Sequence, residues 1–443
     1  MNISKAECCG CGSCANICPT RCVSMREDGE GFLYPVTDVE KCVNCGLCEK
    51  VCSVSEKDTV PTQAVKSAFG CYTLDEETRR NSSSGGIFCE LARNVLQRGG
   101  CVFGVAMDDD CKGASFRKAE TEPELRRLMT SKYVQAFVGD AYREAERELK
   151  AGRDVLFSGT PCHINALRLY LRHSDTNTER LFCVDIICHG TPSPKLWRTY
   201  ANEFEWTRNA RLTSVSFRCK EETWRNLGLC VKGRGKDRTD KKLLVPAEKD
   251  PYMKLFIENY SLRPSCYACS SKKFRLSDLT ISDFWGIENV LPALDDGKGT
   301  SVVLVRTEKG QRMFEDIRES LRYEETSYQD AVRWNPTEYK SVDSPARRGE
   351  FFRDADALTL EELRKKYVRV SLYRRVRSAL GKIWKKIPRW GGGYETSVSL
   401  RSVDGIFLQV MRSDMTTSYL RFLRVMVVLN LLTKPELRKE RAV

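Results

Sequence analysis

CCGCGSCANICP, at residues 8–19, is followed 34 positions later by CVNCGLCEKVCS at residues 42–53. Cysteine supplies 21 of the 443 residues, below the roughly 8 to 10% that marks a disulfide scaffold, and ten of them lie in the first 52 positions. This clustering indicates metal binding. Eight cysteines share the repeated register: Cys8, Cys11, Cys14, Cys18, Cys42, Cys45, Cys48 and Cys52.

The spacing C-x2-C-x2-C-x3-C, followed by proline in the first copy, is typical of bacterial two-cluster ferredoxins. Three close thiolates bind one cluster and the fourth binds the other, so the motif must occur twice. The alternative is a pair of zinc knuckles, which this spacing suits less well. We therefore predict two 4Fe–4S clusters, one bound by Cys8, Cys11, Cys14 and Cys52 and the other by Cys42, Cys45, Cys48 and Cys18.

Several positions around the repeat depart from it or complete it. Gly12 and Gly46 recur, and we expect them to allow close backbone approach. Ser53 stands where a second proline usually follows, a change that we expect to affect the turn more than ligation. Cys9 and Cys22 fall outside the register and are predicted to be small packed residues.

Composition restricts the class of protein further. The N-terminus lacks the apolar core and the cleavage site of a secretory signal, which predicts a reducing, cytoplasmic compartment. No apolar run reaches the roughly 18 residues of a membrane span. The net charge of +13 is concentrated in residues 364–443, which hold 19 Lys or Arg against 5 Asp or Glu.

Beyond the cysteine repeat, apolar strands alternate with helical patterns. Strands are predicted at 68–72, 101–106, 155–157, 184–187 and 301–305, and a helix at 87–96. The expected fold is a multidomain α+β and α/β protein. We expect a ferredoxin domain at 1–56, a linker at 57–66, α/β domains at 67–150 and 151–345, and a basic helical tail at 346–443 that includes an amphipathic pattern from Val370 to Ile387.

Six further motifs occur in order along residues 81–286. They are Asn81-Ser82-Ser83-Ser84-Gly85-Gly86, Ser131-Lys132-Tyr133-Val134-Gln135, Ser158-Gly159-Thr160-Pro161-Cys162, Asp185-Ile186-Ile187-Cys188-His189-Gly190, Ser265-Cys266-Tyr267-Ala268-Cys269 and Ser282-Asp283-Phe284-Trp285-Gly286. On these motifs, residues 1–345 resemble the coenzyme F-420 hydrogenase/dehydrogenase beta-subunit family, a group of iron–sulfur flavoproteins. The resemblance implies FAD and a third 4Fe–4S cluster.

The first of these motifs predicts an anion site. Ser82, Ser83, Ser84, Gly85 and Gly86 precede the predicted helix, where exposed backbone N–H groups suit a flavin pyrophosphate. The alternative is an ordinary serine N-cap. Lys132 is a candidate cation for the same phosphates or for reduced flavin, and its alternative is a solvated lysine.

Other motif residues are placed by the predicted strands. Gly159 and Thr160 follow a strand, a position where α/β sheets bind ligands, so we expect them to face a cofactor or cluster. The family usually has glutamine where His163 stands. Asp283 is predicted to shape the flavin pocket, as is Trp285, for which core packing is the alternative.

The resemblance also implies the ligands of the third cluster. A C-x2-C pair alone fits zinc or a redox disulfide as well. His189 directly follows one of the ligands and is a candidate proton relay or hydrogen-bond donor, with a structural role as the alternative. The four cysteines within the family motifs are Cys162, Cys188, Cys266 and Cys269.

The predicted activity is electron transfer between 4Fe–4S clusters and FAD, which would reduce or oxidise a substrate. Because bacterial relatives often accompany glycan-synthesis genes, glycan biosynthesis is one expectation. The alternatives are a non-catalytic relay subunit and a zinc-bound scaffold. A partner protein or external ferredoxin is the expected redox partner. The basic tail suits an anionic membrane surface at the inner face, or a protein contact, and no nucleic-acid motif accompanies it. Gly233-Arg234-Gly235-Lys236 is predicted to be a charged loop, so a Rossmann site is unsupported.

Overall fold

The computed structural model describes residues 3–56, 61–220, 224–225 and 228–368. The N-terminal module contains helices α1 (Ser13–Ile17) and α2 (Leu47–Lys50) and an antiparallel pair of strands, β1 (Val23–Glu27) and β2 (Leu33–Thr37). The repeat appears in its geometry: Gly12 and Gly46 cap α1 and α2 with φ of 72° and 70°. Because side chains disfavour this left-handed conformation, glycine suits both positions.

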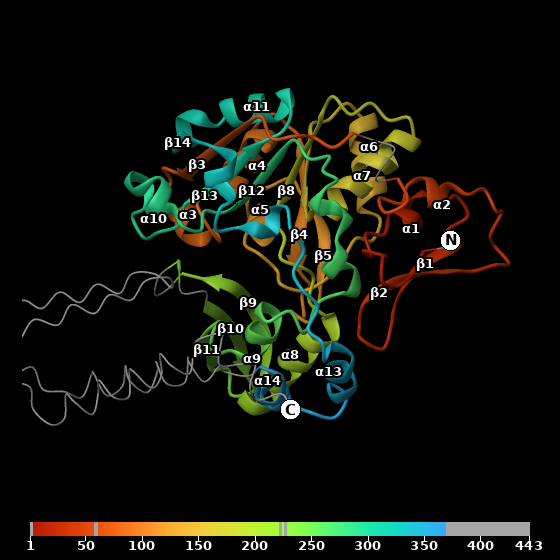
Figure 1. Cartoon of the computed structure of the whole chain (residues 1–443), viewed down its shortest axis with the longest axis vertical. Coiled ribbons are helices and arrows are strands. Elements are labelled where there is room, and N and C mark those ends of the chain that lie inside the picture. The colour runs from red at the N-terminus through yellow and green to blue at the C-terminus, as the bar shows by residue number, and fades with distance from the viewer. Residues whose placement is uncertain (1–2, 57–60, 221–223, 226–227, 369–443) are drawn as a thin grey trace, which may run out of the picture. The chain divides into compact units, whose positions relative to one another are not determined.

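A nine-stranded mixed sheet forms the centre of the protein (Figure 1). Its strands come from both sides of residue 150, so the predicted boundary between two α/β domains falls within one sheet. The mixed α/β class is confirmed. In spatial order the strands are β14 (Leu321–Thr326), β3 (Ser67–Thr73), β13 (Ser301–Val305), β12 (Leu279–Asp283), β8 (Leu181–Ile186), β7 (Val155–Gly159), β4 (Cys101–Met107), β5 (Ala114–Ala119) and β6 (Ala136–Phe137).

Strand direction explains why the predicted site residues gather at one edge. Strands β12, β8, β7 and β4 run parallel, so their carboxyl ends share an edge of the sheet. Strand β13 is antiparallel to both β12 and β3, which brings the carboxyl end of β3 to the same edge. This is the edge at which open α/β sheets bind ligands.

Helices cover both faces of the sheet. Apolar side chains of α4 (Ile87–Gln97), α5 (Glu122–Leu128) and α11 (Glu308–Glu315) pack on one face with Leu156. Side chains of α6 (Ala141–Lys150) and α7 (Pro161–His173) pack on the other face with Phe157. Neighbouring strand residues point to opposite faces, which is why β7 reads as a continuous apolar run. The strands and the helix predicted from the sequence are all present.

A second, three-stranded sheet has the order β11-β10-β9 and packs with helices at its own core. It corrects one prediction: Gly233, Arg234 and Gly235 end strand β10 rather than forming a charged loop. Exposed charges alternate with buried residues there, so the charged face hid the strand pattern. The elements are β9 (Ala210–Cys219), β10 (Gly228–Gly235), β11 (Asp240–Pro246), α8 (Pro194–Arg208), α9 (Pro251–Ile257), α13 (Arg348–Asp354) and α14 (Leu360–Tyr367).

Short helices complete the described chain. They are α3 (Glu76–Asn81), α10 (Ile287–Val290), α12 (Tyr328–Val332), η1 (Pro264–Ala268), η2 (Ser270–Lys272), η3 (Pro292–Leu294), η4 (Arg318–Ser320) and η5 (Pro336–Glu338), where η marks a 3-10 helix.

The predicted tail divides at residue 368. Helices α13 and α14 bury Phe351 and Leu363 in the core around the three-stranded sheet. The predicted basic amphipathic helix from Val370 to Ile387 lies outside the described residues. Within the part of the chain that the structure describes, no helix has the length and apolar character needed to cross a membrane.

Candidate iron–sulfur and cofactor sites

The first cysteine set, defined as Cys8, Cys11, Cys14 and Cys52, is buried in the N-terminal module. Helix α1 carries Cys14, and Cys52 follows α2, so the two halves of the repeat bring their cysteines together. Burial, with repulsion from the Cys8 and Cys52 thiolates, raises the pKa of Cys14 to about 12. Cys8 and Cys52 therefore lie close to Cys14, on opposite halves of the repeat.

The second set, defined as Cys18, Cys42, Cys45 and Cys48, is more accessible, and Cys45 is exposed. Cys22, predicted to be only a packed residue, touches two members of this set. Its sulfur lies 3.3 Å from Cys18 Sγ, and Cys42 packs against the cluster of buried side chains that contains Cys18 and Cys22. The contacts of Cys22 show that Cys18 has been brought to the second half of the repeat, as the predicted ligand exchange requires.

The third set, defined as Cys162, Cys188, Cys266 and Cys269, comes from three separate parts of the chain. Cys162 lies in the first turn of α7, Cys188 follows β8, and Cys266 and Cys269 lie in and after η1. Burial, followed by repulsion from the Cys188 and Cys269 thiolates, raises the pKa of Cys266 to about 12. The pKa of Cys162 is raised by a hydrogen bond that its thiol donates to Cys9, by burial, and by repulsion from the Cys9 and Cys269 thiolates.

The donor chemistry of the third set fits a cluster. The backbone N–H of Thr191 donates to Cys266 Sγ at 3.3 Å, a contact that stabilises a thiolate. All four thiols are half-buried, and the raised pKa values of Cys162, Cys266 and Cys269 mean that a metal group is needed to favour their thiolate forms. In the described residues, no three His, Cys, Asp or Glu side chains are arranged to hold a single metal ion. A four-iron cluster spans more space than one ion, so this finding concerns single-ion sites.

Cys9 lies between the first and third sets. Hydrogen bonds with the side chains of Cys11 and Cys162 hold the pKa of Cys9 well below its usual value. Its sulfur also lies 3.9 Å from Ser53 Oγ. The N-terminal module and α7 therefore meet at cysteine side chains.

The N-terminal module is held against the body by hydrogen bonds to its cysteine loops. Tyr142 Oη donates to Cys11 O at 3.0 Å, and Arg143 Nη2 donates to Cys18 O at 2.7 Å. Gln135, a motif residue, accepts a hydrogen bond from the backbone N–H of Leu33 at 3.0 Å. These contacts fix the module at α6 and the segment before it (Figure 1).

The serine loop of residues 82–86 is not a serine N-cap, because Gly86 caps α4 and no side chain caps it. The serine hydroxyls instead bind the protein. Ser82 Oγ donates to Thr78 O at 2.7 Å, and Ser84 Oγ donates to Thr300 O at 2.8 Å. Ser83 Oγ accepts from the backbone N–H of Ser131 at 2.9 Å, which joins the first two sequence motifs.

Two basic residues that the sequence did not reveal hold this loop. Arg218 Nη2, on β9, donates to Ser83 O at 3.1 Å and pairs with Asp283 at 2.8 Å. Lys220 Nζ donates to Ser84 O at 2.5 Å and to two other carbonyl oxygens. Asp283 ends β12, so the last motif also reaches the serine loop. No local signal marks Arg218 or Lys220, because their partners lie far away in sequence.

Lys132 is turned towards its own loop. Its Nζ donates to Arg127 O at 3.0 Å and to Met129 O at 2.5 Å. Burial lowers the pKa of Lys132 to about 7. The side chain is thus a half-buried amine that donates to carbonyl oxygens, and its motif contacts the serine loop through Ser131.

Gly159 and Thr160 lie at the third cysteine set. Thr160 Oγ1 lies 3.1 Å from Cys162 Sγ and 2.8 Å from His163 Nδ1. Burial lowers the pKa of His163 to about 4, so this ring is neutral near pH 7. The structure therefore divides the predicted cofactor residues between the serine loop and the third set.

His189 is a half-buried ring that directly follows Cys188 of the third set. Its Nε2 lies 2.7 Å from Asn259 Oδ1, and its ring packs edge-on against Phe256 at 5.1 Å. Burial lowers its pKa. One ring nitrogen of His189 is therefore hydrogen-bonded to the side-chain amide of Asn259. The role of His189 as a proton relay stays a prediction.

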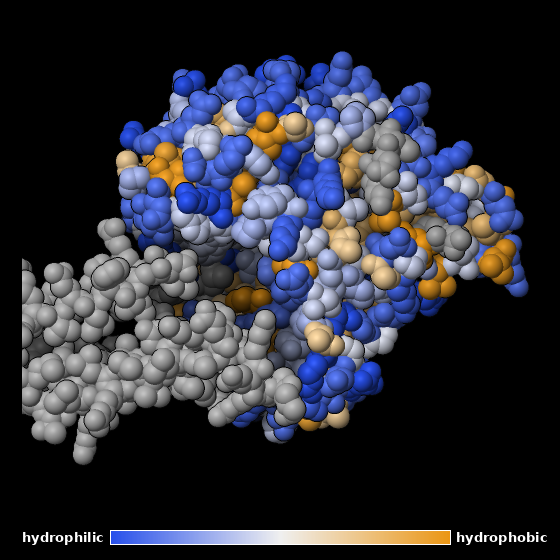
Figure 2. All heavy atoms as spheres, in the orientation of Figure 1, coloured by the Kyte–Doolittle hydropathy of each residue, from blue (hydrophilic) through white to orange (hydrophobic). Residues whose placement is uncertain are grey.

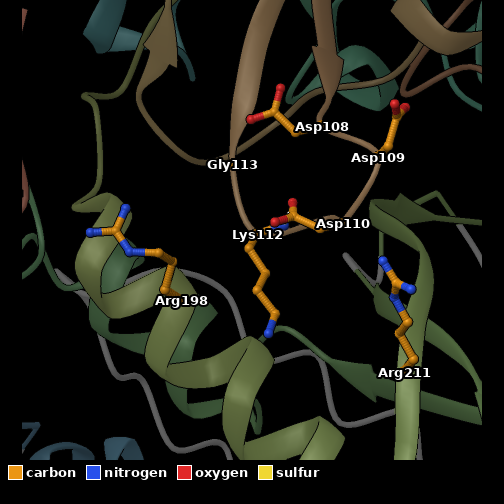
Figure 3. A pocket seen from close by; sticks show the side chains of 7 residues that line it. All are labelled: Asp108, Asp109, Asp110, Lys112, Gly113, Arg198 and Arg211. Carbon is orange, nitrogen blue, oxygen red and sulfur yellow. The ribbon is translucent and has the colours of Figure 1, made fainter.

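One surface hollow, of about 510 Å³, is lined by none of the residues described above (Figure 3). Side chains of Asp108, Asp109, Asp110, Lys112, Arg198 and Arg211 line it. Several of its charges already have partners in the protein: Arg198 pairs with Glu27 at 2.6 Å, and Lys112 with Glu205 at 2.7 Å. We assign it no ligand.

Comparison with known proteins agrees with this geometry. Residues 7–55 match the family of 4Fe-4S dicluster domains. Residues 152–331 match the family described as the C terminus of the beta subunit of coenzyme F420 hydrogenase/dehydrogenase. The family resemblance is confirmed. The two matches show that one chain contains an iron–sulfur module followed by a domain of an oxidoreductase family.

Relatives with known functions match parts of the chain. The F subunit of the F(420)H(2) dehydrogenase of Methanosarcina mazei is 22% identical over 197 residues, 42% of this chain and 54% of that protein. The B subunit of the Na(+)-translocating ferredoxin:NAD(+) oxidoreductase complex of Acetobacterium woodii is 35% identical over 69 residues, 16% of this chain and 19% of that protein. The chain thus spans about half of one relative and a fifth of the other.

Among solved structures, the F420-reducing [NiFe] hydrogenase complex from Methanosarcina barkeri is similar, with a TM-score of 0.40 and 15% identity. The match covers 70% of this chain and 92% of the chain compared.

Proposed function

We propose that this protein is an iron–sulfur flavoprotein oxidoreductase that carries electrons between three 4Fe–4S clusters and FAD. The first, second and third cysteine sets supply the cluster ligands. The observation that carries the proposal is that the loop of the first set lies against the turn that holds Cys162: Tyr142 Oη lies 3.0 Å from Cys11 O and 3.2 Å from His163 O. The two sets are therefore neighbours, as a chain of one-electron carriers requires.

The exposure of the three cysteine sets suggests where electrons enter the protein. The second set includes the exposed Cys45, whereas the first set is buried beside the third. The surface of the N-terminal module shows apolar patches (Figure 2), and its exposed apolar side chains include Val36, Val39 and Val43. We propose that a reduced ferredoxin or partner subunit approaches this end.

FAD is proposed at the carboxyl edge of the nine-stranded sheet, near the serine loop. Its isoalloxazine accepts two electrons and releases them singly. Arg218 and Lys220 bring positive charge to this loop, and Lys132 lies one motif away. Burial lowers the pKa of both lysines to about 7, and an anionic pyrophosphate nearby would favour their protonated forms. Asp283 orients Arg218, and Thr160 borders the third set.

The substrate and location are further parts of the proposal. A compound of glycan biosynthesis is our candidate substrate, on the resemblance to bacterial relatives. We propose a cytoplasmic protein in which the basic part of the tail beyond residue 368, which lies outside the described residues, contacts an anionic membrane surface.

A relay subunit without its own substrate is a second candidate. It is favoured by the names of the two relatives, each of which is a subunit of a larger enzyme. Turnover of a small-molecule acceptor by the purified protein alone would exclude this alternative.

The first experiment is anaerobic purification with iron, sulfide and flavin measured on one sample. About twelve irons and one FAD per chain would support three clusters and a flavin. About eight irons without flavin would contradict the assignment of the third set and of the FAD site.

A further inference from the structure

Arg263 is a buried arginine whose guanidinium is largely unpaired. The residue is 0% exposed, and its Nε donates to Cys8 O at 2.7 Å. Its Nη1 and Nη2 have no hydrogen-bond partner among the residues that the structure describes. Because a buried charge is costly without compensation, such a side chain points to a missing negative group.

Arg263 connects the third cysteine set to the first. Its backbone caps helix η1, which carries Cys266, and its side chain reaches the loop that begins at Cys8. The backbone N–H of Cys266 donates to Arg263 O at 3.0 Å. One residue therefore contacts the loop of the first set through its side chain and the turn of the third set through its backbone.

The N-terminal loop is shaped around this guanidinium. Gly10 has φ of +70°, and a Cβ there would lie 2.8 Å from Arg263 Nη1 and 3.0 Å from its Cζ. The ring of Tyr34 lies 4.0 Å from Cζ and that of Phe32 5.6 Å. The aromatic faces stabilise the cation, but they offer the two Nη groups no oxygen or nitrogen acceptor.

We propose that Arg263 compensates the negative charge of the clusters held by the first and third sets, and thereby sets their reduction potentials. The inference rests on the proposed function, because it requires clusters at these thiols. Ligation by four thiolates makes each cluster anionic, and reduction adds one further negative charge. A nearby buried cation favours the reduced state, so Arg263 raises the potentials. This makes it a positioning and tuning residue rather than a catalytic one.

The test compares Arg263→Gln, Arg263→Lys and the control Arg21→Gln in the full chain, loaded with clusters anaerobically. Arg21 lies on the same module, but its side chain is 67% exposed, so solvent screens its charge. Reduction potentials are measured by redox titration followed by electron paramagnetic resonance. We expect R263Q to lower the midpoint of at least one cluster by about 59 mV, which is tenfold in the one-electron equilibrium. R263K and R21Q should keep midpoints near the wild-type values.

The outcomes separate this inference from the proposed function. Unchanged midpoints in R263Q with wild-type iron content would overturn the inference. If R263Q loses its clusters, R263K decides: retained clusters with wild-type midpoints support charge compensation, and loss equal to that in R263Q overturns it. Iron content tests the proposed function separately. About eight irons in the wild-type protein would show that the third cluster is absent. The midpoint potential of the first cluster in R263Q would then test the role of Arg263.

Discussion

Arg218 on β9 pairs with Asp283 at the end of β12, with 2.8 Å between Nη2 and Oδ1. The pair joins the three-stranded sheet to the carboxyl edge of the nine-stranded sheet. Only 3% of the Arg218 side chain and 14% of the Asp283 side chain are exposed. The same guanidinium donates to Ser83 O, so one contact positions two of the sequence motifs.

Removing one partner of this pair should destabilise the protein more than removing both. We expect Arg218→Met to lower the free energy of unfolding by about 3 kcal/mol, because it leaves the Asp283 carboxylate poorly compensated. The double variant with Asp283→Leu should lose less than the sum of the single losses. Urea unfolding of all four proteins measures this, and additive losses would contradict a direct coupling.

Lys220 should make stability depend on pH. Burial lowers its pKa to about 7, whereas an unfolded lysine titrates near pH 10.4. Between these values the unfolded chain binds a proton that the folded chain does not, so stability rises with pH. The charged groups nearby are Asp283, Arg218, Arg79 and Asp296.

Comparison with Lys220→Met isolates this effect from all other titrations. The unfolding free energy of the wild type minus that of Lys220→Met should increase from pH 7 to 9, by less than about 1.4 kcal/mol per pH unit. It should be flat below pH 6, where Lys220 is charged in both states. Urea unfolding at intervals of one pH unit measures it, and a flat difference across pH 7 to 9 would show that Lys220 keeps its proton.

Asp185 anchors a buried ion network behind the third cysteine set. Its carboxylate lies 2.8 Å from Arg275 Nη1, and Arg275 Nη2 lies 2.8 Å from Glu338 Oε2. We expect Asp185→Asn to lower the unfolding free energy by about 3 kcal/mol, because it removes one of the two carboxylates that pair with Arg275. Thermal unfolding measures the loss. Asp237→Asn, at an exposed turn of the three-stranded sheet, is the control and should change stability little.

Local sequence signals predicted the elements of this fold well where they carry a strong pattern. The cysteine repeat predicted the ferredoxin-like module, and the apolar run Val155 to Phe157 predicted a central strand. Strand β10 was missed because its charged residues face solvent between buried ones. Gly159 was predicted to follow the strand at 155–157, and it is the last residue of that strand in the structure.

Local sequence signals could not predict contacts between segments that are far apart in the sequence. Arg218 and Ser83 are 135 residues apart, and Arg263 and Cys8 are 255 apart. Nothing in the neighbouring residues marks these arginines as special, because their role depends on how distant parts of the chain pack. Cys9 was predicted to be a packed residue, and its contact with Cys162 likewise depends on the docking of the N-terminal module.

The assignment of the third set leads to the most direct test by metal content. Cys266→Ser should lower iron by about four per chain, because a serine hydroxyl is a poor replacement for a thiolate in a 4Fe–4S cluster. The first and second sets lie in a separate module and should keep about eight irons. Iron and sulfide analysis, with the electron paramagnetic resonance spectrum of the reduced protein, measures both quantities.

The matched control is Cys230→Ser, because Cys230 is a buried thiol on β10 of the three-stranded sheet rather than in a cysteine set. It removes one sulfur from the core and should leave iron content unchanged. If both variants lose iron equally, the loss reflects general destabilisation by a buried hydroxyl. If Cys266→Ser keeps all its iron, Cys266 is not a required ligand, and the packed thiols beside Thr191 have a structural role instead.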